Sequence, residues 1–477
     1  MDKLTTNLTP HLTSCASLAA LGIKICKLDL LAPIRKLVHI PQKTVKDTPF
    51  EKVYDAFISI LAGATGLVEI NTRLRSDRAL QLAFGRSRCA EQSVIQETLS
   101  ACTADTVKQM EQAVDQIFQF HSQSYRHNYN TQYQILDVDL TGLPCGKKAA
   151  LATKGYFAGA RNRRGRQMGR VAASRYGEVV VDRLFEGRTN LATAFQPLVQ
   201  AAEQTLALDE IRRARTLLRI DAGGGSLDDV NWALSRGYQV HCKDYSGQRA
   251  RCLAASVITW VDDPDEPGRQ VGWVEEPAPE YVRDVVRIAV RERKPNEQWG
   301  IAVLISSLLP AEVCELSGNS SEHDFDPKVI LLAHVRLYDQ RGGGVETSFK
   351  CDKQGLGLSK RTKKRFEAQQ MVMLLGSLAH NVVVWVQRWL AAPASSPLQH
   401  YGPMRMVRDI FHMSGFLIFD ASCRTRQIAL NQDTPFAPVL LCSLQALMAP
   451  AHVTIHLVRT WVRRTDRLDE ECFSNLQ

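Results

Sequence analysis

The stretch YQILDVDL, residues 133–140, marks the point where the chain changes from helix-forming to strand-forming sequence. In its second half apolar side chains alternate with Asp137 and Asp139, as in a β-strand with one buried face. Upstream, residues 50–120 instead carry the apolar spacing of amphipathic helices. The sequence therefore predicts an N-terminal helical region and a sheet that begins at this strand.

Beyond this strand the chain alternates between strand and helix patterns. Ser226 followed by Asp229 is a capping-box variant that marks a helix start, and Gly237 stands where that helix should stop. The predicted succession is a loop at 153–167, strands at 168–174 and 178–185 around a turn at 175–177, a helix at 191–208, a strand at 215–221, a helix from Ser226 and a strand at 238–243. This order predicts an α/β fold with a ribonuclease H-like core.

The second half of the chain divides by pattern as well. Residues 244–330 form short β-rich runs, and helical patterns return after residue 345. Trp260, Trp273 and Trp299 lie in the β-rich part, where we expect buried core tryptophans. We expect five regions: an N-terminal helical domain at 1–125, the first part of the core at 130–243, a β-rich insertion at 244–330, the second part of the core at 331–395 and a helical C-terminal region at 396–477.

Composition narrows the classes of function. The 477 residues carry a net charge of +9, and the basic excess is clustered, which favours a polyanionic partner. Twelve cysteines show neither C-x-x-C nor a zinc spacing, so we expect reduced thiols. Lys24, Lys27 and Asp29 interrupt the apolar N-terminal stretch, which argues against a signal peptide. The apolar run at 371–392 carries four polar residues in its second half and is interpreted as a core helix.

Acidic residues at three separate places could form a metal site. Asp137 and Asp139 stand two apart on a strand, so both point to the same face. Asp221 ends a strand and is followed by glycines at 223–225, which leave its carboxylate uncovered at the edge of the sheet. Glu346 opens a helix beyond another glycine run. Carboxylates from such places can hold two divalent cations for phosphodiester chemistry. Read separately, they are a solvated strand face, a strand-to-helix turn and a surface ion pair.

The segments DVDLT, RTLLRIDAGG and YDQRGGGVETSFKCDK resemble the DDE transposases of bacterial insertion sequences. The resemblance is to the group with a Y-R-E-K signature and a β-rich insertion before the catalytic glutamate. In that signature two residues separate Tyr from Arg, three separate Arg from Glu, and six separate Glu from Lys. Tyr338, Arg341, Glu346 and Lys353 follow it here, with four residues instead of three between Arg341 and Glu346. The extra residue falls in the glycine run, where a loop or bulge can absorb it. The resemblance covers residues 50 to about 430.

The resemblance implies a ribonuclease H-like core of the retroviral integrase superfamily. It implies that Asp139, Asp221 and Glu346 are catalytic and bind Mg²⁺, with Mn²⁺ as a substitute. The D-x-T context favours Asp139 over Asp137, which stays open as a supporting or substitute ligand. The implied reaction is cut-and-paste transposition: water attacks the phosphodiester at each element end, and the freed 3′-hydroxyl then attacks target DNA.

The resemblance also implies contacts to DNA. Tyr338, Arg341 and Lys353 would grip phosphates beside the scissile bond, where the arginine fork and the lysine charge suit phosphate oxygens. Two basic runs, at residues 160–170 and 359–365, neighbour the predicted acidic elements, and a solvated face is their plain interpretation. The residues from which we expect phosphate contacts are Arg163, Arg164, Lys360, Lys363 and Lys364.

The implied partner is double-stranded DNA, both the terminal inverted repeats of the element and the target. A homodimer would hold the ends in a synaptic complex, with the domain at 1–125 as a DNA-binding domain, in the bacterial cytoplasm at the nucleoid and without a membrane. Two other functions stay open. One is a transposase-derived DNA-binding protein without cleavage activity, and the other is a structure-specific ribonuclease H-like nuclease.

Overall fold

The structure is a computed structural model of the chain and describes residues 9–43, 46–157, 160–295, 298–318, 326–391 and 397–459. The chain forms two compact units. One unit combines Met1–Ala101 with Gly355–Gly357 and Val382–Gln477, and the other contains Cys102–Gln354 and Leu358–Asn381. All of the predicted catalytic residues belong to the second unit.

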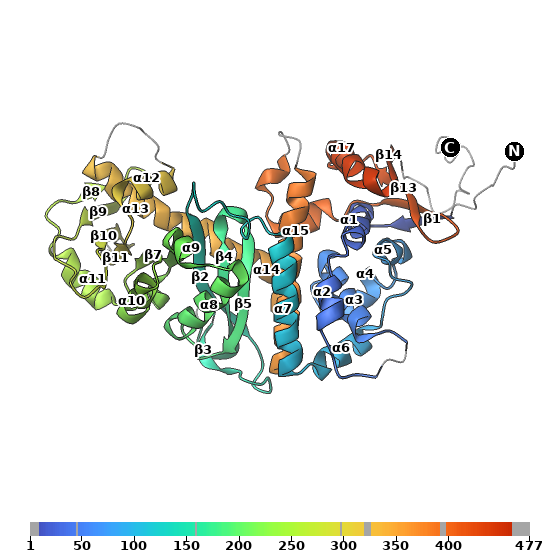
Figure 1. Ribbon diagram of the computed structural model, residues 1–477, viewed down its shortest axis with the longest axis horizontal. Coiled ribbons are helices and arrows are strands. Elements are labelled where there is room, and N and C mark those ends of the chain that lie inside the picture. Colours follow the sequence, from blue (N-terminus) through green and yellow to red (C-terminus); the bar gives the residue numbers. More distant parts are fainter. Residues whose placement is uncertain are drawn as a thin grey trace. The chain divides into compact units, whose positions relative to one another are not determined.

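The second unit is built on a mixed sheet in the order β3-β4-β2-β6-β7-β11-β10-β9-β8, with β5 paired to β4 (Figure 1). Strands β2, β6 and β7 are parallel neighbours, whereas β4 is antiparallel to β2 and β5 is antiparallel to β4. The strand predicted at 133–140 is therefore central. The bounds are β2 Gln134–Pro144, β3 Thr153–Phe157, β4 Ala160–Ala173, β5 Glu178–Glu186, β6 Thr216–Ile220 and β7 Gln239–Lys243.

The β-rich insertion lengthens this same sheet. Its last strand, β11, pairs antiparallel with β7, and β10, β9 and β8 follow outward. The bounds are β8 Val261–Asp262, β9 Arg269–Trp273, β10 Val286–Arg293 and β11 Trp299–Ser306, with helices α11 Gly247–Ala254 and α12 Pro310–Ser317 on either side in sequence. Sequence patterns predicted the strands but not that they would continue the core sheet.

The arginine-rich segment at 153–167 was predicted to be a loop. It instead forms β3 and the first half of β4. Its backbone pairs with itself as a hairpin, and β4 then pairs with β2 from Pro144↔Gly165 to Asp137↔Ala172. Backbone hydrogen bonds between strands do not require apolar side chains. The polar composition of this segment therefore gave no strand pattern from which β3 and the first half of β4 could be predicted.

The helices predicted to begin at residue 191 and at Ser226 begin there, whereas Glu346, predicted to open a helix, ends a π-turn. Ser226 accepts a hydrogen bond from the Asp229 amide, and Gly237 has a positive φ of 92°, which confirms the predicted start and stop of α10. The helices outside the insertion are α7 Ala104–His121, α8 Leu191–Leu206, α9 Glu210–Ala214, α10 Leu227–Ser235, α13 Pro327–Arg341, α14 Thr347–Gln354 and α15 Phe366–Leu390, of which the residues from Val382 belong to the first unit.

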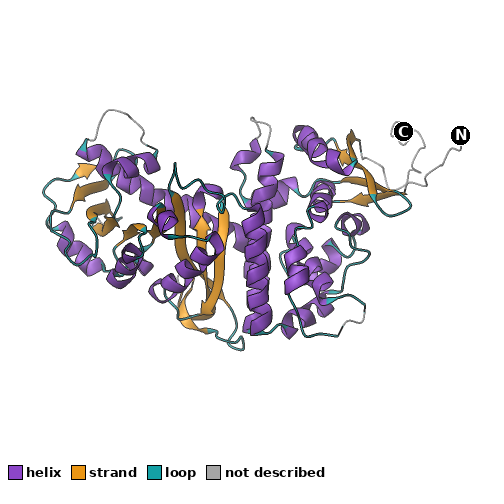
Figure 2. Cartoon of the chain, in the orientation of Figure 1, coloured by secondary structure: helices purple, strands orange, loops and turns teal. Residues whose placement is uncertain are grey.

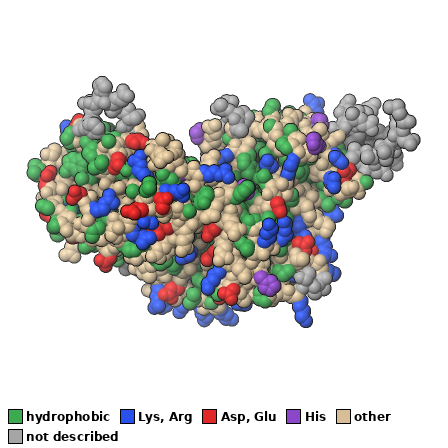
Figure 3. All heavy atoms as spheres, in the orientation of Figure 1, with side chains coloured by type: hydrophobic (Ala, Val, Ile, Leu, Met, Phe, Trp, Pro, Cys, Tyr) green, Lys and Arg blue, Asp and Glu red, His purple; other side chains and the backbone are tan. Residues whose placement is uncertain are grey.

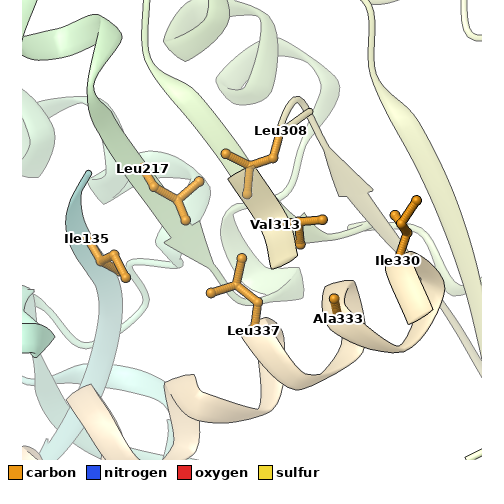
Figure 4. Packing of buried hydrophobic residues seen from close by; sticks show 7 residues of the cluster. All are labelled: Ile135, Leu217, Leu308, Val313, Ile330, Ala333 and Leu337. Atoms are coloured by element: carbon orange, nitrogen blue, oxygen red, sulfur yellow. The ribbon is translucent and has the colours of Figure 1, made fainter. Parts of the chain in front are cut away.

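Helix α13 packs on the face of the sheet that carries the acidic residues. Figure 4 shows Leu337 of α13 near Ile135 of β2 and Leu217 of β6, in a buried cluster that also contains Leu308, Val313, Ile330 and Ala333. Successive side chains of a strand alternate between faces, so Asp137 and Asp139 share a face with Ile135. The apolar cluster therefore brings the end of α13 beside the acidic residues.

One turn of π-helix, Gly342–Glu346, joins α13 to α14. A π-turn accommodates one residue more than an α-helical turn. This turn contains the glycine run in which the spacing from Arg341 to Glu346 exceeds the expected one by one residue, and the helical path continues through it.

The first unit is mainly helical with a small sheet of order β1-β12-β13-β14 (Figure 2). Its helices are α1 Ala16–Lys27, α2 Ala32–Leu37, α3 Pro49–Leu61, α4 Ile70–Arg73, α5 Arg78–Ala83, α6 Gln92–Ala101, α16 Pro403–Arg405 and α17 Ala437–Met448, and its strands are β1 Thr9–Thr13, β12 Gly415–Phe419, β13 Thr425–Asn431 and β14 Thr454–Val458. The prediction of a helical C-terminal region is wrong in this respect. Strand β12 pairs with β1 from the other end of the chain, a partner that local sequence cannot indicate.

Helix α15 contains the apolar run singled out by composition. Among the described helices it is the one that by length and composition could cross a membrane, and 94% of its apolar window is buried in the protein. Within the described residues the cysteines form no disulfide.

Candidate active site

Two of the predicted catalytic acids lie on adjacent parallel strands. Asp139 belongs to β2, and Asp221 directly follows β6, whose Ile220 pairs with Val138. The side chain of Asp139 is 18% exposed, and its Oδ1 accepts a hydrogen bond of 2.7 Å from the Leu140 amide. Asp221 accepts an equivalent bond of 2.7 Å from the Ala222 amide. These amides fix both carboxylates at one edge of the sheet.

The pKa values of the two carboxylates are shifted in opposite directions. Burial raises the pKa of Asp139 to about 6, although Arg341 and the Leu140 amide act against it. Burial acts in the same direction on Asp221, but the Ala222 amide, Arg341 and Tyr338 outweigh it, so the pKa of Asp221 lies below its usual value. Asp221 is therefore ionised at neutral pH.

Arg341 links the first acid to the third. Its buried guanidinium places Nη2 at 2.9 Å from Asp139 Oδ2 and Nη1 at 3.3 Å from Glu346 Oε1. Burial acts to lower the pKa of Arg341, and the carboxylates of Asp139 and Asp221 raise it above its usual value. The changed spacing before Glu346 has thus not displaced Arg341 from the acidic residues.

The other two residues of the signature also reach the acid-bearing strands. The Tyr338 hydroxyl donates a hydrogen bond of 2.9 Å to Asp221 Oδ1. Lys353 donates to the hydroxyl of Thr141, two residues beyond Asp139 on β2. Burial lowers the pKa of Lys353. The structure therefore brings Asp139, Asp221, Tyr338, Arg341, Glu346 and Lys353 together from β2, the end of β6 and the α13–α14 segment.

The carboxylate oxygens of Asp139, Asp221 and Glu346 are suitable ligands for a hard divalent cation. The three side chains do not, however, surround one point. No group of three or more His, Cys, Asp or Glu in the described residues is arranged to hold a metal ion. Carboxylate oxygens are the ligands that Mg²⁺ prefers. The Glu346 side chain is 60% exposed, so its rotamers are free to change and bring its carboxylate toward Asp139 and Asp221.

Asp137 does not face this group as a further ligand. It is fully buried, and Arg219 binds both of its oxygens at 2.7 and 2.9 Å, while Ser174 donates a third hydrogen bond. Arg219 also donates to the Leu337 carbonyl of α13 at 2.8 Å. The Asp137–Arg219 pair therefore joins β2, β6 and α13 directly beneath the site.

The glycine run has a packing reason at one of its positions. A Cβ on Gly344 would lie 2.7 Å from Asp137 Oδ2 and 2.8 Å from Ser174 Oγ, whereas a Cβ on Gly343 would meet nothing within 4 Å. Only Gly344 must lack a side chain for the π-turn to approach the Asp137–Arg219 pair.

We expect Gly344→Ala to lower the free energy of unfolding by about 1–3 kcal/mol because the methyl group overpacks this contact. Gly343→Ala, in the same helical turn, should raise it by about 0.4–1 kcal/mol by restricting the unfolded chain. Urea denaturation of the two variants measures both effects. Equal destabilisation by both would show that the contact at Gly344 is not the cause.

A second buried charge network anchors α14. Arg170 of β4 forms 2.6 Å ion pairs with Asp182 of β5 and Asp352 of α14. His380 of α15 contacts Asp352 at 2.7 Å and the Gly177 carbonyl at 3.0 Å. Asp352 precedes Lys353, so this network fixes the helix that carries the last residue of the signature. Sequence patterns placed Arg170 in an exposed basic run and missed this role.

The predicted DNA-contacting side chains lie in different environments. Arg163, Arg164, Lys360 and Lys364 are exposed, whereas Lys363 is buried and its pKa is lowered to about 8, mainly by burial. Buried Arg166 donates to the carbonyls of Lys363 and Lys364 at 3.0 and 2.9 Å, which ties the second basic run to β4. Figure 3 shows Lys and Arg side chains gathered along the lower edge of the view, over the part of the sheet where β3 and β4 lie in Figure 1.

The prediction that all three tryptophans of the insertion are buried in the core is wrong. Trp273 packs against buried clusters, but Trp299 is 38% exposed, at the start of β11. Arg291 lies over the rings of Trp260 and Trp299. A cavity of about 440 Å³ beside Trp299 extends to Tyr338 and has cationic walls from Lys243, Arg251, Arg269 and Lys294.

Two buried histidines make the packing of α13 sensitive to acid. Burial lowers the pKa of His334 to about 4 and, together with His334, lowers that of His241. Between the ordinary value of 6.5 and this value the unfolded chain binds a proton that the folded chain does not. Stability from this group is therefore complete above about pH 6.5 and is lost as the pH falls toward 4.

At pH 5 the expected cost from His334 alone is about 2 kcal/mol. His334→Phe keeps a ring against Trp273 and His241 and should therefore lose less stability than the unmodified protein between pH 7 and pH 5. Urea denaturation at the two pH values gives the comparison. The same loss in both proteins would exclude His334 as the acid-sensitive group.

Comparison with known proteins gives a likeness in structure. No protein-family model matches the chain, and no curated protein matches it. Among solved structures the chain is similar to the piggyBac transposase in a cryo-EM structure of its synaptic complex with hairpin DNA. The sequence identity is 12%, the similarity covers 98% of this chain and 87% of that chain, and the TM-score is 0.47.

Proposed function

We propose that the protein is a DDE transposase of the bacterial insertion-sequence type, which cleaves DNA at the ends of its element and joins those ends to target DNA. The single observation that carries this proposal is that the residues with the Y-R-E-K spacing lie beside β2 and the end of β6, where two of them contact the acids directly. Tyr338 contacts Asp221, Arg341 contacts Asp139 and Glu346, and Lys353 contacts Thr141.

The strand arrangement supports a ribonuclease H-like core. Three antiparallel strands, β2, β4 and β5, are followed in the chain by two that run parallel to β2, namely β6 and β7. The first acid stands on the central strand and the second at the end of its parallel neighbour. The insertion enters after β7, before the helix that leads to Glu346.

Within this proposal each residue has a physical task. Asp139, Asp221 and Glu346 would hold Mg²⁺ or Mn²⁺, which when bound would activate the attacking oxygen and stabilise the leaving one. The Tyr338 hydroxyl and the Ala222 amide orient the Asp221 carboxylate. Lys353 holds a positive charge beside β2, where it can offset the negative charge of a DNA phosphate. The exposed arginines and lysines beside β4 would bind the DNA backbone further away.

The test uses the full chain, Mg²⁺ and linear DNA that carries candidate terminal repeats taken from the regions flanking the coding sequence. We expect strand cleavage at the repeat ends followed by joining, both abolished by Glu346→Gln. Glu315→Gln removes one carboxylate from an exposed position in α12 and should leave both steps intact. Chelation of the metal should stop the reaction in every sample.

Two results would replace the proposal. Binding of the ends without cleavage would favour a DNA-binding protein derived from a transposase. Cleavage that ignores the end sequence would favour a structure-specific nuclease. The same proposal includes a homodimeric synaptic complex, a DNA-binding role for residues 1–125 and a location at the bacterial nucleoid. The mass of the protein–DNA complex on paired ends tests whether the protein is a dimer there.

A further inference from the structure

Arg341 occupies the oxygens that the proposed function assigns to a metal. Its guanidinium is only 3% exposed and reaches one oxygen of Asp139 and one of Glu346. Mg²⁺ would need such oxygens at about 2.0–2.1 Å in a near-octahedral arrangement. A guanidinium between the two carboxylates stands in the way of that arrangement and repels a second cation in a weakly screened site. Arg341 and a divalent cation therefore compete for Asp139 and Glu346.

The hydrogen bonding of Arg341 is incomplete in its present position. Its Nε is buried without a hydrogen-bond acceptor, and Nη2 meets Asp139 as an ion pair outside hydrogen-bond geometry. A buried donor without an acceptor costs free energy. A phosphate offers several acceptor oxygens to the guanidinium fork, so a DNA backbone at the site would satisfy these donors better than the carboxylates do.

The chain around Arg341 allows such a change of partner. Arg341 is the last residue of α13, and the π-turn Gly342–Glu346 follows it directly. Gly342 and Gly343 have no neighbouring atoms within 4 Å of their Cβ positions. Glycines restrict the backbone least, so the Arg341 and Glu346 side chains can separate while Gly344 stays packed on Asp137.

We propose that Arg341 couples DNA binding to metal binding: it holds the carboxylates in the absence of DNA and transfers to a DNA phosphate when DNA binds, which frees Asp139 and Glu346 for the cation. The inference rests on the proposed function. By linkage, DNA raises the affinity for metal and metal raises the affinity for DNA by the same factor.

The experiment measures Mn²⁺ affinity from the electron paramagnetic resonance signal of unbound Mn²⁺, with and without a short duplex DNA at low ionic strength. Without DNA, Arg341→Ala should bind Mn²⁺ about tenfold more tightly than the unmodified protein, a factor within the usual range for coupled sites. With saturating DNA the two affinities should converge, because DNA has already removed the competing guanidinium. Arg341→Lys, which keeps the charge without the fork, should lie between them.

A matched control removes a different cation from the same helix. Arg336 of α13 pairs with Asp265 at 2.7 Å, away from the carboxylates of the site, so Arg336→Ala should leave Mn²⁺ affinity unchanged. If it tightens binding as much as Arg341→Ala does, net charge and not competition explains the effect. The gain in Mn²⁺ affinity that DNA causes in the unmodified protein tests the coupling even if Arg341→Ala fails to fold.

Asp221→Asn separates the two levels of the proposal. If it abolishes Mn²⁺ binding while Arg341→Ala keeps the same affinity as the unmodified protein with and without DNA, the metal site stands and the competition is refuted. If the unmodified protein binds no Mn²⁺ in either condition and Asp221→Asn changes nothing, the proposed metal-dependent function fails and this inference fails with it.

Discussion

Asp221→Asn is expected to slow DNA cleavage by about three orders of magnitude, because under the proposed function it removes one of the carboxylates that would bind the metal, and with it about 4 kcal/mol of transition-state stabilisation. The substitution preserves shape. The amide oxygen can still accept from the Ala222 amide and from the Tyr338 hydroxyl, which lie at 2.7 and 2.9 Å from Oδ1. What disappears is the negative charge, which the lowered pKa of Asp221 maintains at neutral pH. Single-turnover cleavage of end-bearing DNA in Mg²⁺ measures the rate.

Asp228→Asn is the matched control. Asp228 is exposed in the first turn of α10, seven positions further along the chain, and its neutralisation should change the cleavage rate by less than about twofold, as for a weak, screened surface charge. The melting temperature of Asp221→Asn should stay near that of the unmodified protein. Cleavage that persists at the original rate in Asp221→Asn would remove this residue from the active site.

The second large effect concerns stability. We expect Arg219→Met to lower the free energy of unfolding by about 3–5 kcal/mol, since it leaves the Asp137 carboxylate buried without its partner. Asp137 is fully buried, and Arg219 supplies two of its hydrogen bonds and a third to the Leu337 carbonyl. Urea denaturation measures the loss. Because the pair lies beneath the acids, binding of Mn²⁺ should weaken in the same variant.

A double variant shows whether the unpaired charge is the cause. Asp137→Leu combined with Arg219→Met replaces the ion pair by apolar side chains and should recover much of the lost stability, as apolar substitutes for buried ion pairs commonly do. The single variants Asp137→Leu and Arg219→Met give the losses to compare. If the double variant loses as much stability as the two single variants added together, the pair acts through its shape and contacts and not through its charge.

Spacing in the sequence predicts the residues of the candidate site but not the side chains that support them. Tyr338, Arg341, Glu346 and Lys353 were found by spacing, and the structure places all four beside the strands of the predicted acids. Arg219 was missed, although it stands two residues before Asp221 on the same strand face. Only the register of β2 against β6 indicates its role, because that register pairs Arg219 directly with Asp137.

The basic run of β4 shows why composition misleads. Arg163 and Arg164 are exposed, but Arg166 and Arg170, which look equivalent in the sequence, are buried and bind carbonyls and carboxylates of other elements. An arginine is buried only where acceptors for its donors are available. Those acceptors come from residues up to about two hundred positions away, which no local pattern contains.

Local features of the chain were set by the sequence alone: the strand that carries Asp139, the capped start of α10 at Ser226 and the helices near the N-terminus. Each depends on side chains a few positions apart, so periodicity and capping are sufficient to predict it. Tertiary structure decided which strands pair, that β1 joins β12, that the insertion extends the core sheet, and which charges become buried. Those outcomes depend on competition among distant segments for the same backbone and apolar partners, and that competition is resolved only when the whole chain packs.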